Sequence, residues 1–281
     1  MQRKVLVLPV ALAVAAAVGV VSSCTSSAGH NPASALTAAQ HARADRLVLI
    51  LAGLLPNAED NAFDLEKAAD SERRVASCMT GAGFSYTAKN PHSLVDTDDN
   101  TDFASASYAR THGFGISAWP AFTPDRTNAQ YASSLSTADQ KKFGDTLSSC
   151  SEHAEEQSRR EFGVEFANSR FDRIDGSVRS SAAYRQAADE WRTCAGRAGY
   201  VSQDRTSLIA ALHSRYDTLI TRITGTAELT PAQTEQRAQS DPLYRGFQQE
   251  EIRAAVATFP CSQKLDATYR DAFRTAMKNI P

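Results

Sequence analysis

Apolar residues recur along most of this chain every three or four positions, which is the spacing of one face of an α-helix. The pattern is clearest in two stretches, at Leu208, Leu212, Tyr216, Leu219 and Ile223, and at Leu265, Tyr269, Phe273 and Met277. Further helices are expected over residues 38–54, 61–81, 137–162, 164–176 and 181–197. Because no alternating strand pattern persists long enough to build a substantial sheet, we predict a mainly α-helical fold.

Several expected helices have recognisable boundaries. Three segments match a capping box, in which a threonine hydroxyl and a glutamine three residues later cap the first turn; they begin at Thr37, Thr137 and Thr230. Pro231, at the first helical position, strengthens the third. Pro260 is expected to separate the C-terminal helix from a preceding one, because proline removes a helical hydrogen bond. The core side of that preceding helix would be Tyr244, Phe247, Ile252 and Val256.

Residues 86–130 interrupt the helical pattern. They are rich in Asn, Asp, Pro, Ser and Thr and show no sustained apolar period, so we predict one long irregular segment, with at most a short strand pair. Within it, residues 112–115 (His-Gly-Phe-Gly) and Trp119 form an aromatic and glycine-rich patch. Such a patch can line a ligand groove, but we favour a loop that folds back over the core.

The first 24 residues have the pattern of a bacterial lipoprotein signal. Arg3 and Lys4 precede an apolar stretch over residues 5–21, which is shorter than the roughly 20 residues of a membrane-spanning helix. The stretch ends in Val-Ser-Ser-Cys, which resembles a lipobox. We therefore predict a signal peptide over residues 1–23 and a lipid on Cys24. An ordinary signal peptide with a chance cysteine is the alternative.

Cys24 would become the mature N-terminus and carry fatty acyl chains such as palmitate, because two or more chains give stable anchoring. Residues 24–36 are mostly small and polar, as in a flexible tether. The expected location is the outer face of the bacterial cytoplasmic membrane, with a helical extracytoplasmic domain over residues 37–281.

The composition after removal of the signal peptide is that of an ordinary globular protein. The 258 remaining residues suffice for one large domain or two small ones. They hold 28 basic and 32 acidic residues, a net charge of −4, and no basic stripe. This balance argues against binding to nucleic acid.

Four cysteines remain after Cys24, at positions 78, 150, 194 and 261. An even number in an oxidising compartment predicts two disulfides. No pair has the short spacing of a zinc site, and a reactive thiol would leave one cysteine without a partner.

Two of these cysteines have similar surroundings. Each follows a helical pattern and is followed by a glycine and an aromatic residue with the spacing Cys-x4-Gly-aromatic. The first segment contains Cys78, Gly83 and Phe84, and the second contains Cys194, Gly199 and Tyr200. The spacing is typical of a helix end at which glycine takes the left-handed conformation and the next residue folds back over the helix. The echo is consistent with a degenerate duplication, with halves over residues 37–162 and 163–281, and also with chance similarity.

Four cysteines allow three pairings. A duplication would repeat the same internal link, which favours Cys78–Cys150 with Cys194–Cys261. The competing arrangement joins Cys78 directly to Cys194 and leaves Cys150 with Cys261.

The echoed segments resemble a family of uncharacterised actinobacterial lipoproteins, in which a Trp-x-x-Cys helix ends in Gly-Tyr. The resemblance rests on the lipobox and on about 25 residues around Cys78 and Cys194, and Ala195 stands where that family often has Met. It implies a helical, lipid-anchored protein and brings no assigned activity.

The sequence contains weak indications of chemistry. Residues Asp96–Asp102 open like a calcium loop, but Thr101 stands where the loop needs glycine and Ser107 where it needs glutamate, so we favour a solvated acidic loop. His153, Glu155, Glu156 and Glu161 share a predicted helix without the His-Glu-x-x-His spacing of a zinc site, and we expect a solvated, salt-bridged face. We therefore assign no catalytic, cofactor-binding or metal-binding residue.

These observations favour a non-enzymatic function. We expect a binding or interaction module of the cell envelope, held to the membrane by Cys24, with a cell-wall or protein partner. The alternative is a secreted hydrolase with an unrecognised site that uses carboxylates from the loop over residues 96–102 and from a neighbouring helix. A transporter's solute-binding subunit is disfavoured because the repeated strand-helix pattern is absent.

Overall fold

The computed structural model describes residues 36–55, 57–94, 105–119, 126–225 and 229–279. Within these ranges the chain forms ten α-helices, one short 3-10 helix (η1) and no strand, which confirms the mainly α-helical fold. The elements are α1 (Ala38–Leu51), α2 (Asn57–Gly81), η1 (Pro91–Ser93), α3 (Ala106–His112), α4 (Arg126–Ser134), α5 (Thr137–Glu161), α6 (Val164–Ser180), α7 (Ala182–Arg197), α8 (Arg205–Thr224), α9 (Pro231–Ser240) and α10 (Pro242–Asn279).

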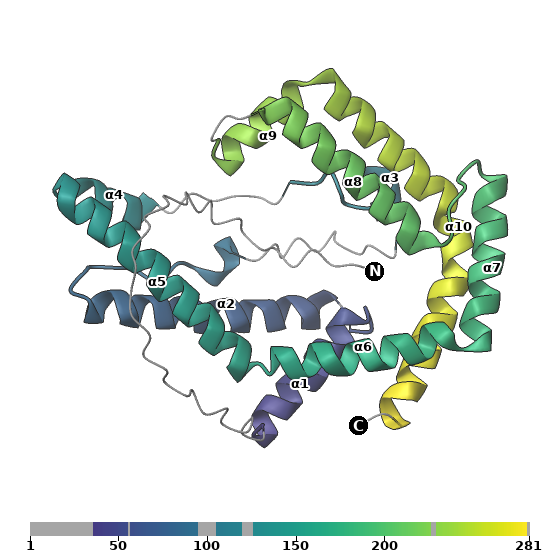
Figure 1. Ribbon diagram of the computed structural model, residues 1–281, viewed down its shortest axis with the longest axis horizontal. Coiled ribbons are helices and arrows are strands. Elements are labelled where there is room, and N and C mark those ends of the chain that lie inside the picture. Colours follow the sequence, from purple (N-terminus) through teal and green to yellow (C-terminus); the bar gives the residue numbers. More distant parts are fainter. Residues whose placement is uncertain (1–35, 56, 95–104, 120–125, 226–228, 280–281) are drawn as a thin grey trace, which may run out of the picture.

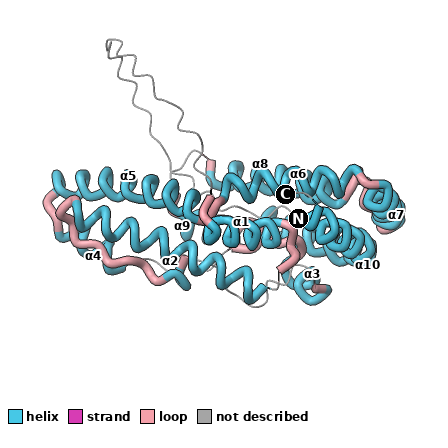
Figure 2. Tube along the Cα trace, turned by 90° about the horizontal axis from the view of Figure 1, so that it is seen from below, coloured by secondary structure: helices cyan, strands magenta, loops and turns pink. Residues whose placement is uncertain are grey.

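The helices form two arms that meet in a common centre (Figure 1). One arm is the α2–α5 pair with α4, and the other contains α8, α9 and the first part of α10. The centre consists of α1, α6, α7 and the end of α10. Figure 2 shows that the described helices together form a flat slab.

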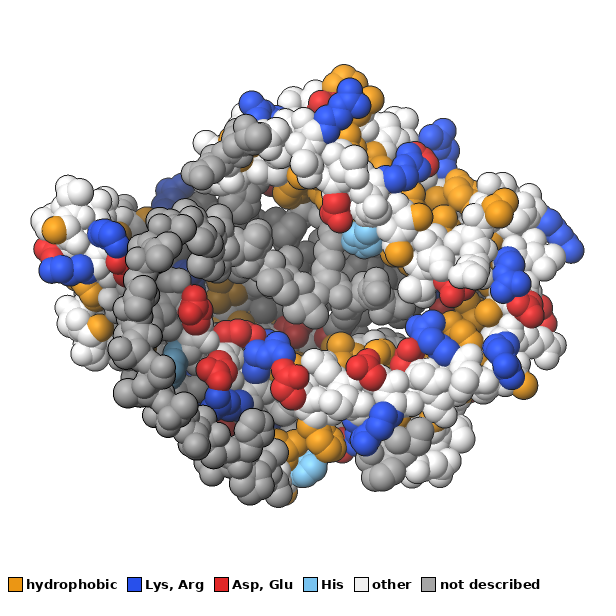
Figure 3. Space-filling view, in the orientation of Figure 1, with side chains coloured by type: hydrophobic (Ala, Val, Ile, Leu, Met, Phe, Trp, Pro, Cys, Tyr) orange, Lys and Arg blue, Asp and Glu red, His pale blue; other side chains and the backbone are white. Residues whose placement is uncertain are grey.

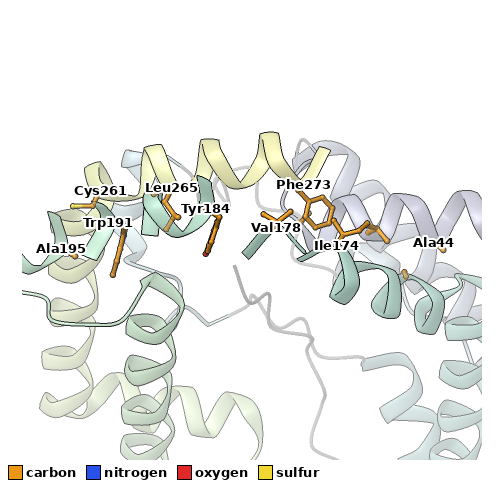
Figure 4. Close-up of a cluster of buried hydrophobic side chains, with 13 residues drawn as sticks. Ala44, Ile174, Val178, Tyr184, Trp191, Ala195, Cys261, Leu265 and Phe273 are labelled. Carbon is orange, nitrogen blue, oxygen red and sulfur yellow. The ribbon is translucent and has the colours of Figure 1, made fainter. Parts of the chain in front are cut away.

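The largest hydrophobic core lies in this centre. Side chains of α10, among them Leu265 and Phe273, pack against Trp191 of α7 and Ile174 of α6 (Figure 4). Both of these α10 side chains are buried, and Tyr269 and Met277 of the same helix pack against the cluster. The apolar pattern of the last stretch therefore predicted its buried face correctly.

Two of the three predicted capping boxes are present, at Thr37 and Thr230. The prediction at Thr137 was wrong, because Ser136 caps α5 and its hydroxyl accepts from the backbone N–H of Asp139. Ser136 and Thr137 are adjacent in the chain, and a serine is at least as good a cap as a threonine. The helix therefore begins one residue earlier than the threonine cap would place it.

The expected break at Pro260 was also wrong, because α10 continues through it. Proline withholds one backbone donor and its ring pushes on the preceding turn, which bends a helix where packing holds both sides. Figure 1 shows that α10 changes direction along its length. Its earlier part packs with α3, α8 and α9, and its later part carries the core contacts to α6 and α7.

The two cysteine-bearing helix ends have the expected geometry. Gly83 and Gly199 have φ angles of 87° and 88°, and the aromatic residue after each donates its N–H back to the helix. In the structure Cys78 is bonded to Cys150, with 5.7 Å between Cα atoms. Cys194 is bonded to Cys261 at 5.6 Å. These are the pairs that the echo favours.

The segment over residues 86–130 contains more helix than predicted, because η1, α3 and the start of α4 fall within it. The described part of it contains no strand pair. Its α3 packs on α10, so a segment from the first predicted half docks on the second. The division into halves over residues 37–162 and 163–281 stays a prediction.

Cys24, most of the tether and the Asp96–Asp102 loop lie outside the described residues. No helix in the part of the chain that the structure describes has the length and apolar character to cross a membrane.

Candidate functional site

A small cleft opens in the centre of the molecule, where the start of α8 meets α6, α7 and α10 over the central core. Its volume is about 50 Å³, enough for a few water molecules or one small polar group. The lining comes from the end of α1, from α6, α7 and α10, and from the start of α8: Leu51, Ala52, Gly53, Phe171, Arg179, Tyr184, Arg205, Thr206, Leu265, Asp266, Tyr269 and Arg270. Tyr184 and Leu265 also belong to the core cluster in Figure 4.

Arg179 organises one wall of the cleft. Its Nε donates to Asp175 (2.6 Å) and its Nη1 donates to the hydroxyl of Tyr184 (2.9 Å). The guanidinium carbon lies 5.5 Å from the ring centre of Tyr184 and 5.6 Å from that of Tyr269. Burial is the largest single influence on the pKa of Arg179 and lowers it, but the hydrogen bond to Asp175 and the electrostatic interactions with Asp175, Tyr184 and Tyr269 together outweigh burial, so the pKa is raised. The guanidinium of Arg179 therefore stays protonated, and it is held in place by its ion pair with Asp175 and its hydrogen bond to Tyr184.

The two tyrosines are neutral donors and acceptors at physiological pH. Burial is the main cause that raises the pKa of Tyr184 and of Tyr269. The hydroxyl of Tyr269 donates to Asp175 (2.7 Å). Neither hydroxyl therefore supplies a general base near neutral pH.

Arg205 forms the opposite wall. Its Nη1 donates to both carboxylate oxygens of Asp266, at 2.8 and 2.7 Å, and its side chain is only 16% exposed. Its Nε is buried and has no hydrogen-bond acceptor among the described residues. A buried donor without a partner is unfavourable, so the polar groups of this wall are incompletely satisfied by the protein itself.

Arg270 is the third arginine of the lining. It makes no ion pair or hydrogen bond with a residue of the described ranges. Since Asp175 faces Arg179 and Asp266 faces Arg205, Arg270 contributes a positive charge without a matching carboxylate. On the face of the molecule shown in Figure 3, basic and acidic side chains are interspersed.

The cleft suits binding better than catalysis. The lining contains no histidine or cysteine, and its one carboxylate, Asp266, is engaged by Arg205. An acid–base pair needs a group that can exchange a proton near neutral pH. Arginine and tyrosine side chains can donate hydrogen bonds to oxygen atoms of a ligand without exchanging a proton.

A second polar centre lies around Glu251, in the arm formed by α8, α9 and the first part of α10. This side chain is fully buried and accepts from the backbone N–H groups of Phe114 (2.9 Å), Ile116 (2.6 Å) and Ser117 (3.0 Å). The hydroxyl of Ser117 donates to it as well, at 2.5 Å. Four donors thus compensate the buried carboxylate, and they tie residues 113–117 to α10.

Tyr244 completes this attachment. Trp119 donates its indole N–H to the hydroxyl of Tyr244, which donates in turn to the backbone carbonyl of Ser117, both at 2.5 Å. Burial is the main cause that raises the pKa of Tyr244 to about 12. The glycine-rich patch therefore folds back over the core, as favoured from the sequence, and this centre serves to position the chain.

The charged residues expected on the surface of α5 lie there. His153, Glu155 and Glu156 are exposed, and Glu155 pairs with Lys67 at 3.2 Å. Glu156 pairs with Arg160, and Glu161 pairs with Arg43 of α1. The expectation of a solvated, salt-bridged face is confirmed. The described residues contain no cluster of side chains suited to hold a metal ion.

The sequence did not reveal the cleft or the buried carboxylate. The three arginines lie on α6, α8 and α10 with no shared local spacing. The apolar residues alone define the expected core side of α10, and Glu251, a charged residue, gives no sequence signal that it is buried. Val256, placed in the core from sequence, is 41% exposed, whereas Glu251 and Thr258 are fully buried.

Comparisons with protein-family models, with curated proteins and with solved structures find no match to this chain.

Proposed function

We propose that this protein is a lipid-anchored binding module of the bacterial cell envelope. Cys24 would hold it to the outer face of the cytoplasmic membrane, and residues 24–36 would let the helical domain reach a ligand or partner in the wall. The cleft between α6, α8 and α10 would be the binding site.

One observation carries the proposal: arginines from three helices converge on a cleft without an available acid or base. Converging cations orient a ligand through charge-assisted hydrogen bonds. The alternative, a carboxylate-based hydrolase, would need two carboxyl groups free to exchange protons. In the cleft Asp266 is paired with Arg205, and the nearby Asp175 is paired with Arg179.

The two cysteine pairs support the proposed location. Disulfides persist in oxidising compartments outside the cytoplasm and are uncommon within it. Together with the signal-like N-terminus, Cys78–Cys150 and Cys194–Cys261 favour an exported domain.

The anchor is tested by replacing its cysteine. In cells fed a labelled fatty acid, the wild-type protein should carry label and sediment with membranes. The Cys24→Ala protein should lose the label and appear in the medium or as uncleaved precursor. A mature N-terminus at another residue without an acyl mass would reject the lipid anchor.

Binding in the envelope is tested by photo-crosslinking in intact cells. A crosslinking amino acid at Thr206, in the cleft, should capture a discrete envelope component. The same amino acid at Lys141, on the far arm, serves as the control and should not capture it. Equal capture from both positions would remove the cleft from the proposal.

A further inference from the structure

We propose that the cleft binds one oxyanion, a carboxylate or phosphate group, and that Arg270 is its principal contact. This inference rests on the proposed binding function and names the class of ligand. The ligand group would sit between Arg270 and Arg205, against the tyrosine rings.

The charges around the cleft allow for one anionic group. Arg179 and Arg205 are each neutralised by an aspartate, so Arg270 is the arginine left without a counter-charge. The negative charge of Asp204 also reaches the cleft at Tyr184, but its carboxylate caps α8, where it accepts from the N–H of Ser207 at 2.7 Å, and does not pair with Arg270. A monoanion would therefore give Arg270 the ion-pair partner that the described residues do not supply.

The donor geometry also favours an oxyanion. Asp266 occupies only the Nη1 end of the Arg205 guanidinium, so the edge that carries Nε and Nη2 makes no hydrogen bond to the described residues. That edge of a guanidinium matches two oxygens of a carboxylate or phosphate. A small rotation of the side chain would bring the buried Nε–H to such an acceptor.

The size of the cleft limits what can enter. About 50 Å³ admits a charged group and little else, so the ligand should present that group at the end of a larger molecule. Apolar walls from Phe171 and Leu265 would favour a small apolar group beside the anion. The free carboxylate at the end of a peptide and a terminal phosphate both have this form.

The test is calorimetric titration of the purified full-length protein in detergent at pH 7 and constant ionic strength. The probes are N-acetyl-alanine, its uncharged amide and inorganic phosphate. We expect saturable binding of at least one of the two anions and none of the amide. Saturation by N-acetyl-alanine alone assigns the site to carboxylates, and saturation by phosphate alone assigns it to phosphates.

Variants on α10 locate the site. Arg270→Gln should weaken the affinity for the anion at least about 10-fold, since a charge-assisted hydrogen bond is lost. The affinity of Arg270→Lys should lie between those of the wild type and Arg270→Gln. Arg274→Gln is the matched control, because Arg274 lies one turn later, is exposed and pairs with Asp271. It should bind within about 2-fold of wild type. Circular dichroism and urea unfolding of each variant verify that it is folded.

Three outcomes would overturn the inference: no saturable anion binding, wild-type affinity in Arg270→Gln, or equal losses in Arg270→Gln and Arg274→Gln. This result is independent of the anchor. Absence of acylation on Cys24 would reject the lipid anchor while leaving the measured anion site intact.

Discussion

Glu251 determines the position of the segment that crosses α10. A carboxylate removed from water is unfavourable unless it is hydrogen-bonded, and this one has four donors from residues 114–117. Its neighbour Glu250 is the same residue type on the exposed side of the same helix, where it pairs with Arg215. The two positions separate the effect of burial from that of charge.

We expect Glu251→Gln to lower the free energy of unfolding by about 3 kcal/mol, because the amide NH₂ group would face donors that need an acceptor. Glu250→Gln should cost about 0.5 kcal/mol, as for an exposed ion pair. Urea denaturation measures both, and hydrogen exchange should show lost protection at Ile116 and Ser117 only for the first. Similar losses in the two variants would contradict the role of Glu251.

Gly113 permits the close approach of this segment. Its φ and ψ are 65° and −123°, and a Cβ there would lie 2.8 Å from Cγ of Glu251. Gly225 ends α8 with nearly the same angles, 62° and −138°, but a Cβ there would meet nothing within 4 Å. The pair therefore separates backbone strain from steric overlap.

Alanine at either position should cost about 1–3 kcal/mol for the backbone conformation. Gly113→Ala should lose a further 1–3 kcal/mol or so, because the added methyl overlaps Glu251 in a packed site. Thermal and urea unfolding of both variants give the comparison. A larger loss in Gly225→Ala would exclude overlap as the reason for glycine at position 113.

At the scale of elements, the start of α5 tests how a helix selects between adjacent caps. Ser136→Ala should destabilise the protein by about 1 kcal/mol, since its hydroxyl accepts from the N–H of Asp139. Thr137→Ala should change stability by less than about 0.5 kcal/mol, because Thr137 lies inside the helix. A larger loss of stability in Thr137→Ala than in Ser136→Ala, measured by urea denaturation, would indicate that Thr137 is the cap.

The Arg215–Glu250 pair links α8 to α10 and makes part of the stability depend on pH. The hydrogen bond from Arg215 lowers the pKa of Glu250. A group with a depressed folded pKa stabilises the protein above its unfolded pKa, about 4.3, and that stabilisation is lost as pH falls through the folded value. The difference in unfolding free energy between wild type and Glu250→Gln, about 0.5 kcal/mol at pH 7, should therefore vanish near pH 2.5. A difference that persists there would contradict this assignment.

At the scale of the whole molecule, each cysteine pair holds a different part of the slab. Cys78–Cys150 lies in the α2–α5 arm, and Cys194–Cys261 lies at the central core beside the cleft. Closing loops of 72 and 67 residues should stabilise the protein by roughly 4 kcal/mol each on the chain-entropy estimate.

A non-reducing peptide map should recover these two pairs. The Cys78→Ala, Cys150→Ala double variant should keep anion binding at Arg270, because its arm lies away from the cleft. The Cys194→Ala, Cys261→Ala double variant should weaken that binding, because it loosens α7 against α10. A recovered Cys78–Cys194 peptide, or binding that depends on the arm pair instead, would contradict this division.

The sequence by itself determined the features that arise from neighbours in the chain. Helix periodicity, the caps at Thr37 and Thr230 and the left-handed glycines at 83 and 199 all depend on residues within one or two turns. The repeated Cys-x4-Gly-aromatic segments also favoured, through the duplication that they suggest, the cysteine pairing found in the structure. Local geometry contains enough information for the helices, the caps and the two glycines, whereas the cysteine pairing was inferred from the internal repeat.

Only the tertiary structure decided which polar groups are buried and which converge. The donors to Glu251 lie 134 to 137 positions away, and the cleft unites residues from five helices. Likewise α10 passes through Pro260 because contacts with other helices hold both sides of the bend. From sequence alone, a charged residue is expected to be exposed. Its burial is favourable only where packing brings distant hydrogen-bond donors to it, as at Glu251.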